Sequence, residues 1–501
     1  MGALHTYAMR MTSCARICRA VFLCLGTLVS AMLNLIAAEE PKPEGSRPNI
    51  LFCIADDWSY PHAGAYGDPV VKTPTFDRVA REGVRFTHAF CAAPSCSPSR
   101  AAILTGQAPH RLEAGGNLWG FLPSKFKVYP DLLEQAGYVV GLMRKGWGPG
   151  SLEAGGWKRN PAGPTFKNFA EFFKTVPSGQ PFCFWFGSPD PHRPYVNGSG
   201  LKSGLKPENV AVPSWLPDTP EIRSYILDYY FEVERFDREV GEVLKILEAV
   251  GQLDNTLVVI TSDNGMPFPR AKTNLHDSGS RMPLAIRWPA RFQGGRTLDT
   301  LVSLTDMAPT FLEAAGLQPL AEMTGKSLLS LLTGQENPAT RNQVFIERER
   351  HANKRKGDLS YPVRALRTKD FLYVRNLRPE RWPGGDPEKW VAVGEYGDCD
   401  NSPSKESVLA HRDEPIAAKA FQLAFAKRPP DELYDLSKDP HQVHNVAGWP
   451  EYAAIQTKLR ATLDRWMRET KDPRADGGGD EFDRYPYFGD AKRMPVREGG
   501  K

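Results

Sequence analysis

Short apolar runs that end in polar residues place the tightest limit on the fold of this chain. The run at 49–55 is continuously apolar, as expected of a strand that is covered on both faces, and it stops at Asp56 and Asp57. Two further runs, at 182–186 and 256–261, are followed by Ser188-Pro-Asp-Pro-His192 and by Ser262-Asp-Asn-Gly265. Ligands bind at the carboxyl ends of strands in open α/β sheets. The pattern therefore predicts one rim at which three strands bring polar side chains together.

The pattern of elements changes along the chain. Apolar residues recur at helical spacing from about 220 to 250, and strands alternate with helices up to about residue 335, which predicts a doubly wound α/β domain. Beyond it, short strand candidates (344–346, 363–367, 371–374) precede a loop rich in proline and glycine and a helix near 453–469. We predict an α/β domain over 39–340 and a smaller α+β domain over 341–501, with a polar tail from Asp472 that wraps the surface.

The first 38 residues are typical of an export signal. Residues 1–38 contain three arginines and no acid, with an apolar stretch at 20–33 and two alanines before Glu39. This arrangement predicts a secretory signal peptide, cleaved after Ala38. A membrane anchor is the alternative, but Asn34 and the small residues follow the apolar stretch directly, and no later segment is apolar enough to span a bilayer. We expect a secreted or periplasmic protein, lysosomal in a eukaryotic host, without stable membrane insertion.

Charge and cysteine content narrow the function further. The chain has 63 basic and 59 acidic residues, and loss of a leader with three arginines brings the two nearly into balance, which gives no argument for nucleic-acid binding. Five cysteines would remain: Cys53, Cys91, Cys96, Cys183 and Cys399. An odd count in an exported protein leaves at least one free thiol or one modified residue.

The most informative segment is Cys96-Ser-Pro-Ser-Arg100, followed by Leu104-Thr-Gly106. A lone cysteine is more often structural, but here the whole set stands in register. The segment resembles the signature of type I sulfatases, in which the cysteine is oxidised after translation to formylglycine. The resemblance extends from about residue 48 to 472. It implies an alkaline-phosphatase-like sulfatase fold, with a large doubly wound sheet and a smaller α+β part.

The resemblance also implies a mechanism. In the family, hydrated formylglycine attacks sulfur through one hydroxyl, and its second hydroxyl later expels sulfate, which is nucleophilic catalysis with a built-in release step. Arg100 follows Cys96 by four residues, about one helical turn, and is placed to stabilise the attacking oxyanion. A formylglycine-generating maturation enzyme must reach Cys96 before folding buries it.

A set of oxygen ligands accompanies the signature. Asp56 and Asp57 after one strand, with Asp263 and Asn264 after another, match the family's cation ligands, and the modified Cys96 completes the protein's share of the shell. Such oxygens suit Ca²⁺, or else Mg²⁺, rather than zinc or copper. A lone pair of aspartates would be assigned to a solvated turn or helix cap, but the position of this pair, forty residues before the signature, favours the metal site.

Three more residues match sulfatases as catalytic groups. Lys145 aligns with a lysine that contacts the sulfate, although Trp147 replaces the histidine expected two residues later, and an exposed loop lysine is the alternative. His192 lies in a stretch that resembles Pro-His-x-Pro, whose histidine contacts the bridging atom and protonates the leaving group. Lys272 corresponds to the second sulfate-binding cation. Asp190 and Arg193, beside that histidine, are candidates for binding the substrate.

Several segments resemble one branch of the family, the N-sulfoglucosamine sulfohydrolases or sulfamidases. They are Ser262–Pro269, Lys272–Leu275, Ser360–Arg364 and Glu432–His441, although this branch has arginine in place of Lys272. A basic cluster near 347–355 opens the second predicted domain. There we hypothesise that Arg350 or His351 contacts the sugar, the alternative being a solvated charged loop.

The sequence thus predicts hydrolysis of a sulfated sugar, with the N-sulfated glucosamine ends of heparan-type glycosaminoglycans favoured. One alternative is an exo-acting O-sulfatase on another sulfated polysaccharide. A phosphodiester or phosphonate monoester hydrolase of the same superfamily and a non-catalytic glycan-binding protein are less favoured.

Overall fold

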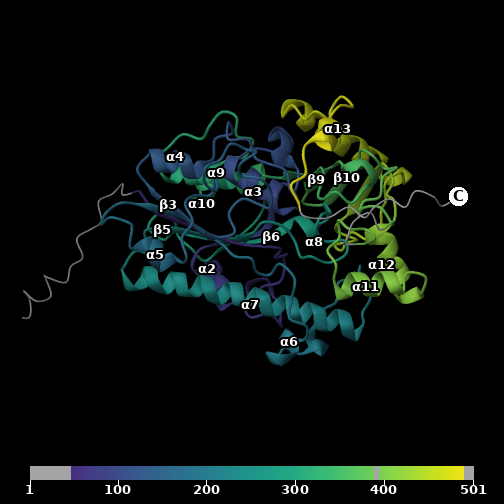
Figure 1. Ribbon diagram of the computed structural model, residues 1–501, viewed down its shortest axis with the longest axis horizontal. Coiled ribbons are helices and arrows are strands. Elements are labelled where there is room, and N and C mark those ends of the chain that lie inside the picture. Colours follow the sequence, from purple (N-terminus) through teal and green to yellow (C-terminus); the bar gives the residue numbers. More distant parts are fainter. Residues whose placement is uncertain (1–46, 389–393, 490–501) are drawn as a thin grey trace, which may run out of the picture. The chain divides into compact units, whose positions relative to one another are not determined.

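Two β-sheets organise the part of the chain that the computed structural model describes, residues 47–388 and 394–489 (Figure 1). The larger sheet has seven strands in the order β3-β4-β1-β5-β6-β2-β7, and the smaller has four in the order β11-β10-β9-β8. The strands of the larger sheet are β1 Asn49–Ala55, β2 Val84–Phe90, β3 Val139–Arg144, β4 Phe182–Gly187, β5 Thr256–Ser262, β6 Arg281–Arg287 and β7 Arg296–Ser303. The strands of the smaller sheet are β8 Gln343–Arg348, β9 Val363–Thr368, β10 Phe371–Asn376 and β11 Asp431–Asp435. The predicted α/β fold with a larger and a smaller sheet is confirmed.

Strand β1 lies in the middle of the larger sheet, and every one of its residues is buried. It pairs in parallel with β4 on one side and with β5 on the other, and β3 continues the parallel half beyond β4. Because both faces of such a strand are covered, its sequence is apolar throughout instead of alternating. The three predicted strands are confirmed as β1, β4 and β5, and their carboxyl ends share one edge of the sheet.

The other half of the sheet departs from a purely parallel arrangement. Strand β6 runs antiparallel to β5, and β2 runs antiparallel to β6, while β7 is parallel to β2. Antiparallel neighbours need no crossover helix, so the chain can return from β5 to β6 through the loop at 263–280. That loop therefore stays at the same edge of the sheet as the ends of β1 and β4.

Helices cover both faces of the larger sheet (Figure 1). Ile50, Phe52 and Ile54 of β1 belong to the core beneath α3, α4 and α9, whereas Leu51 and Cys53 belong to the core beneath α2 and α7. The long helix α7 was predicted at about 220–250 and starts with a side-chain cap from Thr219 to the backbone N–H of Ile222. The helices are α2 Pro74–Glu82, α3 Cys96–Thr105, α4 Tyr129–Gln135, α5 Phe169–Phe173, α6 Ser199–Lys202, α7 Pro220–Ala249, α8 Asp277–Ser280, α9 Met307–Ala314, α10 Leu329–Leu332, α11 Pro403–Ala410, α12 Pro415–Phe425, α13 Ala453–Glu469 and α14 Glu481–Arg484.

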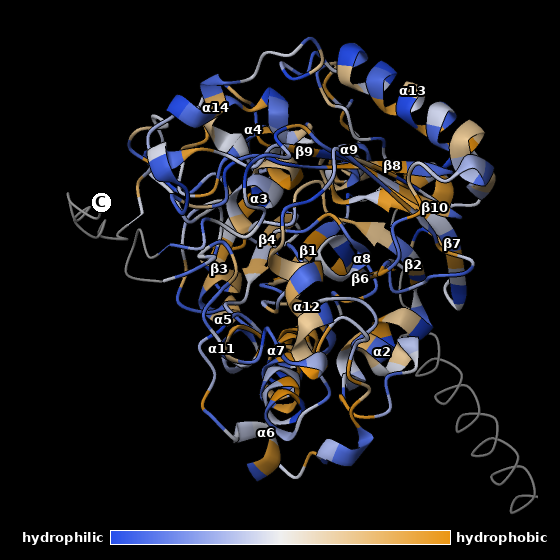
Figure 2. Ribbon diagram, turned by 90° about the vertical axis from the view of Figure 1, so that its right-hand side faces the viewer, coloured by the Kyte–Doolittle hydropathy of each residue, from blue (hydrophilic) through white to orange (hydrophobic). Residues whose placement is uncertain are grey.

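The smaller sheet packs against α13. Leu459, Leu463 and Met467 of this helix are buried in one core with residues of β9, β10 and β11, and the Phe345 and Trp466 rings stack with centroids 4.4 Å apart. In Figure 2 hydrophilic residues, drawn in blue, prevail along α13, whereas hydrophobic residues, drawn in orange, are prominent on the strands near it. An amphipathic helix of this kind buries its apolar stripe and leaves the rest to solvent.

The segment after α13 returns to the body of the molecule. Phe482 is buried, and its carbonyl accepts a hydrogen bond from the Asn117 side chain at 2.9 Å. Arg350 donates to the carbonyl of Tyr485 at 2.7 Å. The described part of the tail therefore packs against the body of the molecule through Phe482 and Tyr485.

The predicted boundary between residues 340 and 341 falls between β7 and β8, and it stays a prediction. The predicted signal peptide, residues 1–38, lies outside the described residues. Within residues 47–388 and 394–489, no helix is long and apolar enough to cross a membrane.

Candidate active site

The predicted metal ligands meet at the carboxyl edge of the larger sheet. Ala55 of β1 lies opposite Ser262 of β5, so the residues that follow the two strands face one another. Asp56, Asp57, Asp263 and Cys96 each offer one ligand atom, and these four atoms all lie within 4.8 Å of one another. All four side chains are buried. Strand register thus converts two distant sequence segments into one cluster of acidic oxygens.

The fifth predicted ligand, Asn264, supplies the clearest sign that this cluster fits a cation. Its amide nitrogen donates to Asp57 at 2.5 Å, while its amide oxygen is buried and has no hydrogen-bond partner among the described residues. A buried acceptor without a partner is unfavourable, and such atoms are few in folded proteins. Carboxylate and amide oxygens are the ligands that Ca²⁺ and Mg²⁺ take. The donor set therefore fits a hard divalent cation.

Asp57 has an unusual backbone conformation and an unusual pKa. Its φ is 75°, in the left-handed region that residues other than glycine seldom adopt, and its N–H donates to Asp263 at 3.2 Å. Burial raises the pKa of Asp57 to about 6, against the opposing effects of Lys272 and His192. For Asp56, burial also acts upward, but nearby cations, above all Lys145, hold its pKa well below the usual range. The two adjacent carboxyls thus have pKa values shifted in opposite directions because their neighbours differ.

Cys96 is the first residue of α3. Its sulfur lies 3.4 Å from Asp56 Oδ1, and the residue is only 3% exposed. Burial and the Asp56 carboxylate raise the pKa of the Cys96 thiol well above its usual value. Since the thiolate is the reactive form of cysteine, the unmodified side chain would be a poor nucleophile here.

Arg100 lies on the same helix, one turn after Cys96. Its Nε donates to Asp263 at 2.7 Å, and another nitrogen donates to the carbonyls of Lys145 and Gly146 at 2.8 and 3.0 Å. The side chain is fully buried. Arg100 thus joins the acidic cluster to the loop that follows β3.

That loop carries Lys145, whose ammonium group lies 2.5 Å from Asp56. Burial acts to lower the pKa of Lys145, but Asp56, Cys96 and Asp263 together outweigh it, so the pKa is raised. Trp147 is buried where the family has a histidine, and within the described chain its indole N–H has no acceptor. Trp147 belongs to the same core as Ile50, Phe52 and Ile54 of β1.

Two more cationic or basic groups lie beside Asp57. Lys272 Nζ lies 2.8 Å from Asp57 Oδ2, and His192 Nε2 lies 3.8 Å from the same oxygen. His192 Nδ1 is 2.5 Å from the carbonyl of Arg193, which requires Nδ1 to be the donor and leaves Nε2 facing the cluster. Lys145, Lys272 and His192, which are far apart in the sequence, therefore surround the paired aspartates.

The four residues predicted to bind the substrate have different partners in the structure. The Asp190 carboxylate pairs with Arg235, and the Asp190 carbonyl accepts a hydrogen bond from the N–H of Asp56. Asp190 therefore holds the backbone of a predicted cation ligand. Arg193 donates to the carbonyl of Asn401 at 2.5 Å, on a loop beside the site.

His351 and Arg350 differ although they are neighbours. His351 Nδ1 lies 2.8 Å from the hydroxyl of Ser95, next to Cys96, and burial lowers the pKa of His351 to about 3, so its ring is neutral. Arg350 instead donates to the tail carbonyls of Asp483, Tyr485 and Pro486. These bonds hold the tail, and a contact of Arg350 with the sugar stays a prediction.

Sequence reasoning missed Asp400, whose Oδ2 lies 3.4 Å from Lys272 Nζ. No motif surrounds it. Its approach depends on how the loop before α11 packs against the rim, which is a tertiary feature without a local signal.

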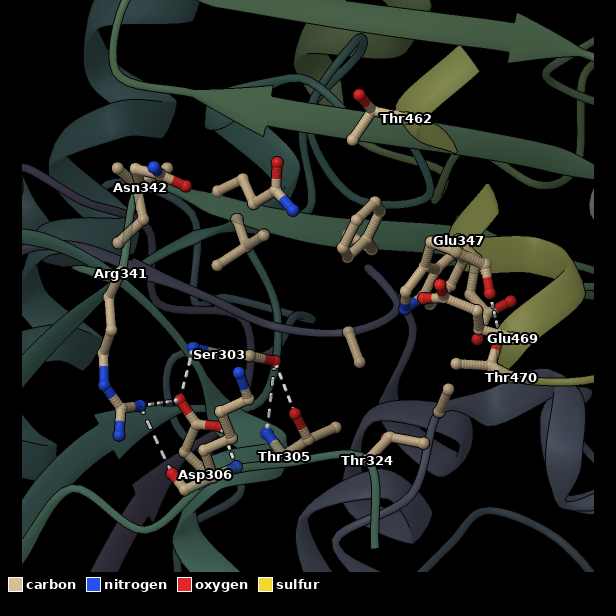
Figure 3. Close-up of a pocket in the computed structure, with 18 of the residues that line it drawn as sticks. Ser303, Thr305, Asp306, Thr324, Arg341, Asn342, Glu347, Thr462, Glu469 and Thr470 are labelled. Atoms are coloured by element: carbon tan, nitrogen blue, oxygen red, sulfur yellow. Dashed lines mark hydrogen bonds and ion pairs between the residues drawn. The ribbon is translucent and has the colours of Figure 1, made fainter. Parts of the chain in front are cut away.

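Two cavities lie away from this cluster. One of about 400 Å³ is lined by residues that include Asp306, Arg341 and Thr470. Arg341 pairs with Asp306 there (Figure 3), with 3.2 Å between Nη1 and Oδ2. Another, of about 550 Å³, is lined by residues that include Tyr60 and Trp215. No predicted site residue lines either cavity, so neither cavity contains the acidic cluster.

The predicted cation ligands and catalytic residues of this site lie in a segment that matches a known protein family. The sulfatase family model matches residues 48–152 and 153–317, which include every predicted cation ligand. This chain belongs to the sulfatase family. A second model, the C-terminal part of N-sulphoglucosamine sulphohydrolase, matches residues 271–383 of this sulfatase.

Individual relatives agree with the family match. Human N-sulphoglucosamine sulphohydrolase is 31% identical over 481 residues, covering 85% of this chain and 91% of that protein. N-acetylglucosamine-6-O-sulfatase from Bacteroides thetaiotaomicron is 24% identical over 580 residues, covering 93% and 94%. A protein solved with its substrate D-glucosamine-2-N,6-O-disulfate has a TM-score of 0.64 at 20% identity, covering 86% of this chain and 99% of that one. This last likeness supports the fold.

Proposed function

We propose that this sulfatase removes sulfate from the nitrogen of N-sulfoglucosamine at the ends of heparan-type chains, using formylglycine made from Cys96 and one Ca²⁺ ion. The observation that carries the proposal is the ring of Asp56, Asp57, Asp263 and Asn264 beside Cys96, with an unpartnered amide oxygen. Such a ring suits a divalent cation that shares a nucleophile with a substrate anion.

Each residue then has a defined task. The acidic ring and Asn264 hold the cation, which, with hydrated formylglycine, would supply an oxygen nucleophile of lowered pKa for attack on sulfur. Lys145, beside Asp56, and Lys272, beside Asp57, would pair with sulfate oxygens. His192 offers Nε2 as the proton donor to the leaving atom.

The choice of sulfamate rests on similarity rather than on a contact to sugar. The human relative and the C-terminal model both carry the name N-sulphoglucosamine sulphohydrolase. A second candidate is hydrolysis of O-sulfate esters, which the similarity to an N-acetylglucosamine-6-O-sulfatase favours. In both cases the substrate is a sulfated sugar.

The proposal also covers export of the protein, maturation of Cys96 and division into domains. We propose that residues 1–38 direct export and are removed, and that a maturation enzyme converts Cys96 before α3 is buried. We also propose that the chain divides into domains near residue 340, between the two sheets.

Sulfate release from matched glucosamine substrates tests the proposal. Matured enzyme with calcium is given glucosamine sulfated at nitrogen or at O6, and Cys96→Ala serves as the control. We expect a higher kcat/KM on the N-sulfated sugar and no release by the variant. Preference for the O6 ester would support the second candidate, and inactivity on both would reject glucosamine as the substrate.

A further inference from the structure

Asp400 is a carboxylate at the site to which the proposed chemistry gives no task. Its Oδ2 is 3.4 Å from Lys272 Nζ, and ligand atoms of Asp57, His192 and Asp400 all lie within 4.8 Å of one another. The Asp400 side chain is 26% exposed, yet Oδ2 itself is buried and accepts no hydrogen bond from the described residues. Lys272 is therefore an ion-pair partner of Oδ2 but not a hydrogen-bond donor to it, and the carboxylate as a whole stays partly exposed beside His192.

The backbone around Asp400 is firmly held. Lys405 donates to the carbonyl of Cys399 at 2.9 Å and to the Asn401 side chain at 3.0 Å, and Arg193 donates to the Asn401 carbonyl. Two residues earlier, buried Asp398 pairs with Arg348 and Arg355. A side chain on a backbone that is held in this way loses less conformational freedom when a ligand binds, which helps it to discriminate between ligands.

Asp400 brings a negative charge close to the groups proposed to bind sulfate. Burial acts to raise its pKa, but Lys272, His192 and His351 hold it below the usual range, so the group is an anion. Lys272 already has a carboxylate partner in Asp57. An additional anion beside the sulfate pocket weakens the binding of any sulfate, unless the rest of the substrate brings a cation during the reaction.

A sulfamate brings such a cation at the atom that leaves sulfur, whereas the amino group of an O6-sulfated glucosamine is not its leaving atom. As the proposed formylglycine oxygen bonds to sulfur and the sulfur–nitrogen bond breaks, both electrons of the broken bond go to nitrogen, which takes one proton from His192 to become an amine and a second from solvent to become ammonium. When a sulfate ester is cleaved, the leaving oxygen takes one proton and becomes a neutral hydroxyl. An anion near His192, the proposed proton donor, therefore favours the first reaction over the second.

We propose that Asp400 is the residue that selects sulfamates, by pairing with the amino group that forms as sulfate leaves. This inference rests on the proposed function of the site. It assigns the discrimination between N- and O-sulfated sugars to a residue outside the sulfatase signature and outside the cation ligands.

The kinetic test uses matured enzyme, Asp400→Asn, and the matched control Asp413→Asn. Asp413 lies between α11 and α12, and its side chain is 98% exposed. We expect Asp400→Asn to lower kcat/KM for N-sulfoglucosamine by about 10- to 100-fold, the range for loss of a charge-assisted hydrogen bond, and to change the O6 ester by less than about threefold. The control should change neither. Equal losses on both substrates would show that Asp400 only positions Lys272 and would overturn the inference.

A binding test separates this inference from the proposed function. Glucosamine, which is cationic, and N-acetylglucosamine, which is neutral, are titrated calorimetrically into the Cys96→Ala protein with and without Asp400→Asn. We expect glucosamine to bind more tightly, and Asp400→Asn to remove that advantage without affecting N-acetylglucosamine. If the advantage survives Asp400→Asn, or is absent from the start, Asp400 is not the selecting group, even where the enzyme hydrolyses sulfamates. If the wild-type enzyme releases no sulfate from N-sulfoglucosamine, the proposed function fails first and this inference with it.

Discussion

Replacing Arg100 with alanine should destabilise the protein much more without calcium than with it. The fully buried guanidinium is within 2.7 Å of Asp263 and also donates to two backbone carbonyls. In chelator, the variant leaves the Asp263 carboxylate buried without its cationic partner, which costs about 3–5 kcal/mol. That is a large share of a stability of about 5–15 kcal/mol.

Calcium should return part of this loss. If Asp263 ligates the ion, its charge is neutralised even without Arg100. Mainly the Gly146 carbonyl then loses its donor, at about 1–3 kcal/mol, because the Lys145 carbonyl still accepts from the Trp185 indole N–H. We therefore expect a difference of about 2 kcal/mol between the two conditions. By linkage, the variant should bind calcium about 30-fold more tightly than the wild type.

Urea unfolding in chelator and in excess calcium measures the first quantity, and calorimetric titration measures the second. Arg287→Ala is a matched control, because Arg287 is buried and pairs with Glu82 and Asp254, which are not among the proposed calcium ligands. Its loss should be the same under both conditions. An equal loss for Arg100→Ala would refute the placement of the cation at Asp263.

Three further results are expected. Because burial raises the pKa of Asp57 to about 6, that carboxyl must release a proton to ligate calcium at lower pH, so calorimetric affinity should be weaker at about pH 5 than at about pH 7.5; affinity that does not change would contradict the assignment. His192→Ala should lower kcat on sugar sulfates by about 10²- to 10⁴-fold but spare an aryl sulfate, whose leaving group needs no proton, and equal losses in steady-state assays would exclude proton donation. Phe482→Ala should lower the free energy of unfolding by about 3–5 kcal/mol in urea titrations, whereas the control Phe488→Ala, at an exposed position, should cost far less; similar costs would mean that the tail is not anchored through Phe482.

Local patterns were enough to predict much of the fold. The strand at 49–55 and the helix at 453–469 have the predicted bounds, because an unbroken apolar run and a helical periodicity each report directly on burial. The antiparallel course of β6 was not predicted. Strand direction depends on how the loop at 263–280 returns to the sheet, and local periodicity does not carry that information.

The same division holds for the site. Asp56, Asp263 and Cys96 could be singled out because they stand in motifs or directly after apolar runs, and the structure brings them together. Asp400 could not, since its nearness to Lys272 comes from packing between distant segments. The bonds from Arg350 to the tail could not be predicted for a related reason, because a basic residue in a sequence does not reveal which distant carbonyls it will meet.

Sulfate release measured against the state of Cys96 tests the central claim most directly. Protein is produced with and without a formylglycine-generating enzyme, and the mass of the peptide that contains Cys96 is determined in each sample used for the assay. The account predicts that release from N-sulfoglucosamine rises in proportion to the converted fraction and is absent from Cys96→Ala. Release that is independent of the converted fraction, or that persists in Cys96→Ala, would contradict it.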